Sequence, residues 1–348
     1  MSENKLARTY LEVMEEFIKA HPEKDPLIKF RDVQIGFRRG IDFRIVIQNL
    51  NLDIFKGEIL GLVGESGSGK TTIGRSINRI YPTSGGEILY NNVKINGKIP
   101  HDRERNMKKN IQMIFQDPSA SLNERANVDY VVSEGLRAFH LYKDENERVE
   151  KVVSMMHKIG LPPEFLKRYP HEFSGGQRQR IGVARCMVME PEFVIADEPI
   201  SALDVSIRAQ VLNLIKEFQV SDQLTVLFIA HDLSVVRYIS DRIAVINNGK
   251  IVELCHADRL FELPLHPYTK ALLTAIPLPD PQLEADKKIV VYNANMHQYT
   301  DEDPADLYEV EPNHFVRANQ AELVDYLTTV KIEGGKTHGK KHSANESK

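Results

Sequence analysis

Runs of apolar residues of strand length alternate with segments of helical periodicity along much of the chain. The strand-length runs are 27–35, 43–54, 58–63, 193–196, 225–230 and 243–246. Helix-compatible segments begin at 69 and cover 203–219 and 233–240. The last three strand-length runs are continuously apolar rather than alternating, which is typical of parallel strands covered on both faces. The pattern predicts an α/β fold built on a mainly parallel core sheet.

Two further parts of the chain depart from this alternation. Residues 117–172 have few strand-like runs but helical spacing at 127–139 and 145–159, which predicts a helical insertion. Near the N-terminus, helical spacing over 6–20 ends before a His-Pro pair and predicts a short amphipathic helix. That helix either packs on its own domain or contacts a partner or a membrane surface.

The chain beyond the last of these strands changes in composition. A proline-rich and acidic stretch starts at Pro277, order is expected again at 315–331, and 334–348 has no apolar anchor and is predicted to be disordered. The expected organisation is an N-terminal extension (1–26), a main domain (27–275) with a helical subdomain at about 117–175, a C-terminal extension (276–333) and the tail (334–348).

Composition narrows the possible classes of function. Of the 348 residues, 42% are hydrophobic and 27% are charged, and the formal charge of −4 offers no basic surface for nucleic acid. The two cysteines are too few for a disulfide framework and fit a reducing compartment. Because no run approaches the roughly 18 to 20 apolar residues of a membrane span, and the N-terminus does not resemble a signal peptide, we expect a cytoplasmic protein.

A glycine-rich segment follows the strand predicted at 58–63. Gly64-Glu65-Ser66-Gly67-Ser68-Gly69-Lys70-Thr71 matches the G-x-x-x-x-G-K-[ST] pattern in its required place between a strand and a helix. Glycines let backbone N–H groups wrap phosphates at a helix N-terminus, Lys70 reaches the β/γ-phosphates, and the Thr71 hydroxyl can ligate Mg²⁺. A chance match has a frequency of roughly 1% in a chain of this length. The segment therefore predicts nucleotide binding.

Two carboxylates end the apolar run at 193–196. A strand that ends in an acid beside a phosphate loop is the expected place for a second Mg²⁺ anchor, which assigns this role to Asp197. Glu198, one residue further on, is then placed to polarise the attacking water as a general base. The alternative is that the two acids merely end a strand in solvent. It does not explain why they occur together with Lys70 in one chain.

Residues 173–180, Phe-Ser-Gly-Gly-Gln-Arg-Gln-Arg, resemble the signature sequence of the ATP-binding cassette family. The resemblance implies a P-loop cassette in which an antiparallel β subdomain and a helical subdomain accompany the core sheet. It also implies a head-to-tail dimer, in which the signature of one cassette closes over the γ-phosphate held by the other. The signature residues expected to make this contact are Ser174, Gly175, Gly176 and Gln177.

Other elements of that family follow along the chain. Gln116 is similar to the glutamine that the family places near Mg²⁺ and the water, Asp204 to the loop that crosses the dimer interface, and His231 to the switch histidine that contacts the γ-phosphate. Phe37 falls where the family stacks an aromatic ring on adenine, although Phe30 and Phe43 are nearby and any of the three could be core. The resemblance thus implies ATP binding by Phe37, Gly64, Ser66, Gly67, Ser68, Gly69, Lys70, Thr71 and Thr72, Mg²⁺ binding by Thr71, Gln116 and Asp197, and catalysis by Glu198, His231 and Gln116.

Four stretches, 63–70, 115–123, 169–176 and 265–273, are similar to the peptide and nickel import ATPases of this family. The resemblance is strongest to oligopeptide importers and implies a second, related ATPase, two transmembrane permease subunits and an extracytoplasmic peptide-binding protein as partners. It places the chain peripherally, at the cytoplasmic face of the membrane. Import of dipeptides or nickel is an alternative, and a soluble cassette ATPase outside transport is a weaker one. The presence of Asp197, Glu198 and His231 disfavours a subunit that binds ATP without hydrolysing it.

The C-terminal extension departs from many relatives, which carry cysteines there that bind an iron-sulfur cluster. No cysteine follows Cys255, although 312–317 resembles the surrounding sequence. We therefore expect ATP and Mg²⁺, but no cluster.

Overall fold

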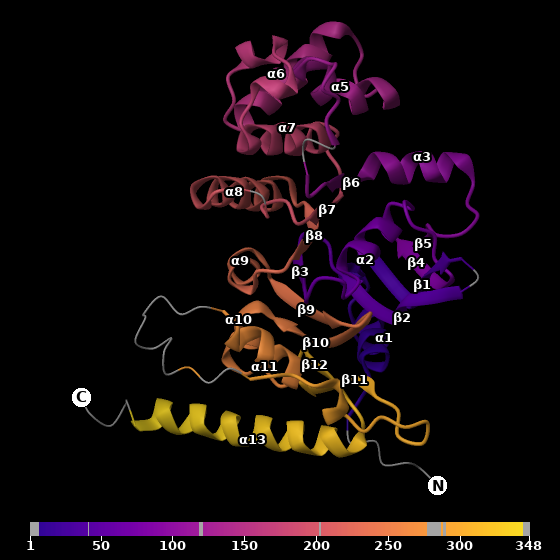
Figure 1. The fold of residues 1–348 in the computed structure, drawn as a ribbon, viewed down its shortest axis with the longest axis vertical. Coiled ribbons are helices and arrows are strands. Elements are labelled where there is room, and N and C mark those ends of the chain that lie inside the picture. The colour runs from indigo at the N-terminus through magenta and orange to yellow at the C-terminus, as the bar shows by residue number, and fades with distance from the viewer. Residues whose placement is uncertain are drawn as a thin grey trace.

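The computed structural model describes residues 7–40, 42–117, 121–201, 203–276, 287 and 290–343. The molecule is elongated, with a group of helices at one end, sheets in the middle and a long helix across the other end (Figure 1). This is the α/β architecture predicted from the sequence, with a mainly parallel core sheet, an antiparallel sheet and a helical part. Within the described ranges, no helix combines the length and the apolarity needed to cross a bilayer.

The core sheet has eight strands in the order β11-β12-β10-β9-β3-β8-β7-β6. Six of them lie in the main part of the chain: β3 (Ile59–Val63), β6 (Ile111–Ile114), β7 (Phe193–Asp197), β8 (Thr225–Ala230), β9 (Arg242–Asn247) and β10 (Lys250–His256). Neighbouring strands from β6 to β9 pair in parallel, and β10 joins β9 antiparallel. Every residue of β3, β7 and β8 is buried, which is why their sequences are continuous apolar runs.

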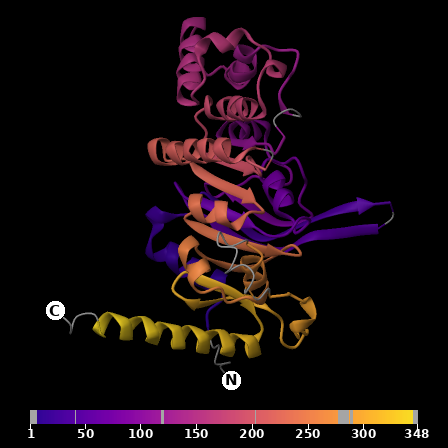
Figure 2. The ribbon, with the colours of Figure 1, turned by 60° about the vertical axis from the view of Figure 1, so that its left-hand side comes forward.

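A second, antiparallel sheet has the strand order β2-β1-β4-β5. Its strands are β1 (Ile28–Arg39), β2 (Asp42–Ile54), β4 (Gly85–Tyr90) and β5 (Val93–Lys94). The long β1–β2 hairpin projects from the side of the molecule in Figure 2. The sequence predicts β1 and β2 as strands, at 27–35 and 43–54, and the structure lengthens β1 to Arg39.

Helices of the main part cover the sheets and form the helical end of the molecule. They are α2 (Lys70–Ile77), α3 (His101–Asn110), α5 (Val128–Phe139), α6 (Glu145–Lys158), α7 (Gly175–Met187), α8 (Val205–Asp222), α9 (Leu233–Ile239), α10 (Ala257–Glu262) and α11 (Pro267–Thr274). Short 3₁₀ turns occur at Pro22–Lys24, Pro163–Lys167, Pro170–Glu172 and Ala294–Met296. The helices predicted at 127–139 and 145–159 are confirmed as α5 and α6.

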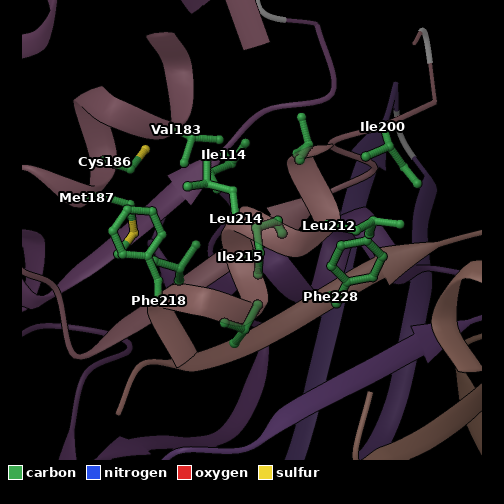
Figure 3. Close-up of a cluster of buried hydrophobic side chains, with 14 of the residues drawn as sticks. Ile114, Val183, Cys186, Met187, Ile200, Leu212, Leu214, Ile215, Phe218 and Phe228 are labelled. Carbon is green, nitrogen blue, oxygen red and sulfur yellow. The ribbon is translucent and has the colours of Figure 1, made fainter. Parts of the chain in front are cut away.

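One apolar core joins the helical end to the sheet. Figure 3 shows side chains from β6, α7 and α8 gathered in this core. The cluster includes Ile114 of β6, Val183, Cys186 and Met187 of α7, and Leu214, Ile215 and Phe218 of α8. Because α7 begins at the signature segment, this packing fixes the position of the signature relative to the core sheet.

The N-terminal helix α1 (Tyr10–Ala20) packs on its own domain, which selects between the two alternatives left open by the sequence. Thr9 caps it in a reciprocal pair with Glu12. The Tyr10 hydroxyl accepts the Asp53 N–H at 2.8 Å and donates to the Asp53 carboxylate at 3.0 Å, and its ring meets Phe315 edge-on at 5.0 Å between centroids.

The C-terminal part adds β11 (Asp306–Glu311), β12 (His314–Ala318) and α13 (Gln320–Ser343). Both strands extend the core sheet, since β12 pairs antiparallel with β10. The ordered segment expected at 315–331 is therefore a strand followed by a helix. The structure differs from the disordered tail expected at 334–348, because the backbone of α13 continues to Ser343 and only the last five positions lie outside the described residues.

Candidate functional site

The glycine-rich segment forms a loop between β3 and α2, as its sequence pattern requires. Gly69 lies at the N-cap of α2 with φ 108°, and Gly67 has φ 83°, backbone conformations that disfavour residues with a Cβ. Gly64 has no room for a side chain, because a Cβ there would lie 2.2 Å from the carbonyl oxygen of Ile246. Residues 65–67 are exposed, whereas Gly64, Ser68, Gly69 and Lys70 are buried.

Lys70 lies folded across this loop. Its Nζ donates to the carbonyl oxygens of Gly64 at 2.7 Å and Glu65 at 2.9 Å. Burial lowers the pKa of Lys70, while the carboxylates of Glu198 and Asp197 raise it. The buried Ser68 hydroxyl has no hydrogen-bond partner among the residues that the structure describes, so it is free to bind a phosphate oxygen. An ammonium, a spare hydroxyl and the N-terminus of α2 at one loop fit a polyphosphate.

Thr71 and Asp197 meet beside the loop. The Thr71 hydroxyl donates to Asp197 Oδ1 at 2.9 Å, and Asp197 closes β7 with 1% of its surface exposed. Burial raises the pKa of Asp197, whereas the Thr71 hydrogen bond and the nearby Arg75 lower it. A hydroxyl and a carboxylate are the oxygen ligands by which proteins hold Mg²⁺ together with phosphates and water, so this pair fits that ion. Thr72, next in α2, is partly exposed.

Glu198 brings the remaining predicted catalytic residues together. Its Oε2 accepts from Gln116 Nε2 at 3.1 Å and lies 3.4 Å from His231 Nδ1. Glu198 has φ 47°, an unusual conformation for a side-chain-bearing residue, and its N–H donates to the carbonyl of Ile229 at the end of β8. The ends of three neighbouring strands, β6, β7 and β8, thus converge on one carboxylate.

The signature segment has local hydrogen bonds. Ser174 caps α7 by accepting the Gln177 N–H, and the Gln177 side chain accepts the Ser174 N–H. Ser174 and Gly175 are exposed, while Gly176 is buried against Ile207, where a Cβ would lie 2.4 Å from that side chain. The segment therefore presents a hydroxyl and the start of a helix to the exterior.

Asp204 lies at the N-cap of α8, one turn from this contact. Its carboxylate accepts from the Ile207 N–H at 3.0 Å and the Ser206 hydroxyl at 2.8 Å. The Ile207 amide and the Ser206 hydroxyl lower the pKa of Asp204. Asp204 therefore orients the start of α8, where Ile207 contacts Gly176 of the signature segment.

The three candidate aromatic residues for adenine have different surroundings. Phe30 has 0% exposure and belongs to the core. The ring of Phe43 lies over Gly36, and Phe37 is half-buried and meets Tyr81 edge-on at 5.1 Å between centroids. Phe30 is thus unavailable for stacking on a ligand, whereas Phe37 and the 52% exposed Phe43 are both accessible, and Phe37 stays a prediction.

Sequence reasoning missed three residues around the site. The Arg75 guanidinium donates to the Tyr81 hydroxyl at 2.9 Å and lies 3.9 Å from the Asp197 carboxylate, so it connects the aromatic pair to the acid. Tyr268 accepts a hydrogen bond from the loop residue Glu65. Arg75 could have been identified from its spacing, because it lies one turn after Thr71 in α2. Tyr268 lies far from the loop in sequence, and no sequence pattern connects it to the site.

A phosphate loop between β3 and α2, beside the acidic end of β7, defines the class of P-loop nucleotide-binding proteins. Comparison with known families narrows this class. The profile of the family described as ABC transporter matches residues 47–201, and that described as oligopeptide/dipeptide transporter, C-terminal region, matches residues 252–301.

Individual proteins agree with the family profiles. The chain is similar to the oligopeptide transport ATP-binding protein OppF of Streptococcus pyogenes serotype M1, with 58% identity over 302 residues that cover 87% of this chain and 98% of the relative. The protein of the same name from Bacillus subtilis (strain 168) is 54% identical over 277 residues, 80% of this chain and 91% of the relative. A solved post-hydrolysis dimer of the ATP-binding cassette MJ0796, bound to ADP and Pi, matches with a TM-score of 0.61 and 26% identity, covering 66% of this chain and 98% of that chain.

The chain therefore belongs to the ABC transporter family, and it is one of the ATPases of that family. The predicted fold class and the resemblance to ATP-binding cassettes are confirmed at this level. The individual site residues stay predictions, supported by the distances and hydrogen bonds that bring their side chains together. The absence of an iron-sulfur cluster also stays a prediction.

Proposed function

We propose that this chain hydrolyses ATP to energise the import of oligopeptides across a cytoplasmic membrane. The observation that carries the proposal is the convergence of Gln116, His231 and Glu198 beside the Thr71–Asp197 pair at one phosphate loop. The names of the relatives and the match of residues 252–301 to an oligopeptide/dipeptide transporter region support the substrate class.

In this proposal the phosphates of ATP lie against the loop residues Gly64 to Thr72, at the N-terminus of α2. Lys70 exchanges its two carbonyl partners for phosphate oxygens, since an ammonium gains more from a phosphate than from a peptide carbonyl. Thr71 and Asp197, with Gln116, would hold Mg²⁺, which when bound would neutralise negative charge on the phosphates. Phe37 stacks on the adenine ring.

Glu198 is the general base. Only 17% of its side chain is exposed, and its Oε2 accepts a hydrogen bond from Gln116, which leaves the carboxylate with lone pairs to accept a proton from the attacking water. His231 lies beside the same carboxylate with 61% of its side chain exposed, and in this proposal it contacts the γ-phosphate. The two side chains thus orient the water and the phosphate for in-line attack.

Ser174, Gly175, Gly176 and Gln177 complete the site of a second cassette rather than their own. Their local hydrogen bonds leave the Ser174 hydroxyl at the exterior, where it can donate to a phosphate held by another chain. Asp204 lies at the same interface. The partner is a related ATPase, and ATP joins the two chains until hydrolysis allows them to separate.

The remaining partners are two permease subunits and, through them, an extracytoplasmic peptide-binding protein, so the chain lies peripherally at the cytoplasmic face of the membrane. The test is to extract membranes gently from the host carrying a tagged chain and to identify what co-purifies. Recovery of two multi-spanning proteins, a second cassette ATPase and a peptide-binding protein is the expected result. Soluble ribosomal or nucleic-acid partners would overturn the transport role while leaving the ATPase.

Substrate class is tested separately in cells that depend on imported peptides for an essential amino acid. A strain lacking this chain should lose growth on oligopeptides and regain it with the wild-type gene. Loss of growth on dipeptides alone, or of nickel-dependent activity alone, would replace the oligopeptide assignment by the corresponding alternative.

A further inference from the structure

A tyrosine from the C-terminal side of the cassette touches the phosphate loop. The Tyr268 hydroxyl, on α11, accepts the N–H of Glu65 at 2.9 Å. Tyr268 is 2% exposed, and burial raises its pKa to about 12, so its hydroxyl is neutral at physiological pH. It supplies a fixed acceptor to a backbone amide of the loop, 203 positions earlier in the chain.

The peptide of Glu65 is thereby held on both sides. Its N–H is bound by Tyr268, and its carbonyl oxygen accepts from Lys70 Nζ at 2.9 Å. A second contact comes from the turn between β9 and β10, where the Gly249 N–H donates to the carbonyl of Ser68 at 3.0 Å. Two downstream segments therefore constrain the loop at points three residues apart.

The position of Tyr268 is fixed in turn by buried polar groups. The Tyr268 N–H donates to Nδ1 of His266, which caps α11, at 3.1 Å. The fully buried Glu253 carboxylate accepts the Leu265 N–H at 2.9 Å and the His266 N–H at 3.1 Å. Glu253 also lies 2.8 Å from Nε2 of His314 on β12. A continuous set of contacts thus leads from the C-terminal strand to the loop.

We propose that Tyr268 is a positioning residue for ATP, which holds the phosphate loop in its binding conformation, and that β12 of the C-terminal part sets its position through Glu253. A loop that binds phosphates through backbone amides gains affinity when those amides are already oriented, because less conformational entropy is lost on binding. The inference rests on the proposed ATP site, since it assigns a role at the same loop.

The test compares Tyr268→Phe with Tyr308→Phe in the purified full-length chain. Tyr308 is a matched control, because it is also a buried tyrosine of the C-terminal half and its hydroxyl also accepts one hydrogen bond, from Gln320 at 3.1 Å, but it does not touch the loop. We expect Tyr268→Phe to raise the Kd of a fluorescent ATP analogue and the KM for ATP by about threefold to tenfold, with a smaller change in kcat. Tyr308→Phe should leave Kd and KM unchanged.

Amide hydrogen exchange gives a readout that does not depend on ATP. The Glu65 N–H should exchange slowly in the wild type and in Tyr308→Phe, and faster in Tyr268→Phe, because only the last variant removes its acceptor. His314→Gln, which disturbs Glu253 from β12, should speed the same exchange by a smaller factor.

Lys70→Ala separates failure of this inference from failure of the proposed site. If Lys70→Ala loses ATP binding while Tyr268→Phe keeps wild-type Kd and Glu65 exchange, the positioning role is wrong and the site stands. Equal weakening by Tyr268→Phe and Tyr308→Phe would likewise refute it, as an unspecific loss of stability. If Lys70→Ala binds ATP normally, the proposed site itself is wrong.

Discussion

The pairing of His314 with Glu253 predicts a marked dependence of stability on pH. Burial lowers the pKa of His314, but hydrogen bonds with Cys255, Glu253 and Glu311 outweigh it and raise the pKa to about 11. The imidazole is 1% exposed and Glu253 is 0% exposed, so solvent screens the pair little. His314 is therefore a buried cation between two carboxylates in the folded chain.

The direction of this pH dependence follows from which state, folded or unfolded, binds the His314 proton more tightly. In the unfolded chain His314 has a pKa near 6.5, so between about pH 6.5 and 11 the folded state binds more protons than the unfolded state. The stabilisation is complete below pH 6.5 and is lost as pH rises toward 11. Where the folded state binds one full proton more than the unfolded state, each rise of one pH unit lowers the free energy of unfolding by about 1.4 kcal/mol.

The assay is urea unfolding at pH 7 and pH 9 of the wild type and His314→Gln. The variant should be less stable at pH 7 by about 3 to 5 kcal/mol, because Glu253 then lies buried without its cation. Over the two pH units the wild type should lose about 2.7 kcal/mol more than the variant, because the comparison subtracts the contribution of titrating groups that do not contact His314. Equal losses in the two proteins would show that His314 is not protonated in the folded state and refute the reasoning.

Three further outcomes are expected. Glu198→Gln should lower kcat for ATP hydrolysis by at least about 100-fold and retain bound ATP in a closed dimer, and normal turnover would contradict its role as base. Asp197→Asn should weaken the apparent affinity for Mg²⁺ in the hydrolysis assay by at least about tenfold while ATP still binds without metal, and an unchanged Mg²⁺ titration would remove it from the metal site. Tyr10→Phe leaves the buried Asp53 N–H without an acceptor and should lower the free energy of unfolding in urea by about 1 to 3 kcal/mol. The control Tyr130→Phe, at an exposed tyrosine, should leave it unchanged. Equal losses of stability in the two variants would contradict the docking of α1.

The parts of the site that depend on local sequence were predictable. Gly64 to Thr71 must form a turn between a strand and a helix, and Asp197 must end a buried strand, so their roles follow from neighbours within a few residues. Gln116 and His231 carry no such local pattern. Their placement rested on the resemblance, and the structure brings both to Glu198 because parallel strands end at the same edge of the sheet.

The parts that depend on distant pairing were not predictable. β6 is only four residues long. β12 joins the core sheet by pairing with β10, and β11 follows by pairing with β12, a choice that no periodicity within 306–318 encodes. The contact of Tyr268 with Glu65 is of the same kind, since a tyrosine at the start of a short helix reads as an ordinary core residue. Helix α13 continues past 334 despite three glycines, against the low propensity of those residues.

The docking of α1 also bears on how the chain is made. Arg8 pairs with Glu309, 301 positions later, and the Glu309 N–H donates to the Arg8 carbonyl. At ordinary rates of translation, those positions leave the ribosome about 15 to 60 s apart. During that time the Tyr10 hydroxyl can already bond Asp53 of β2, but its ring has no Phe315 to pack against, so the docking of α1 is completed only when synthesis is nearly finished. The first helix to be made is therefore among the last to reach its complete packing.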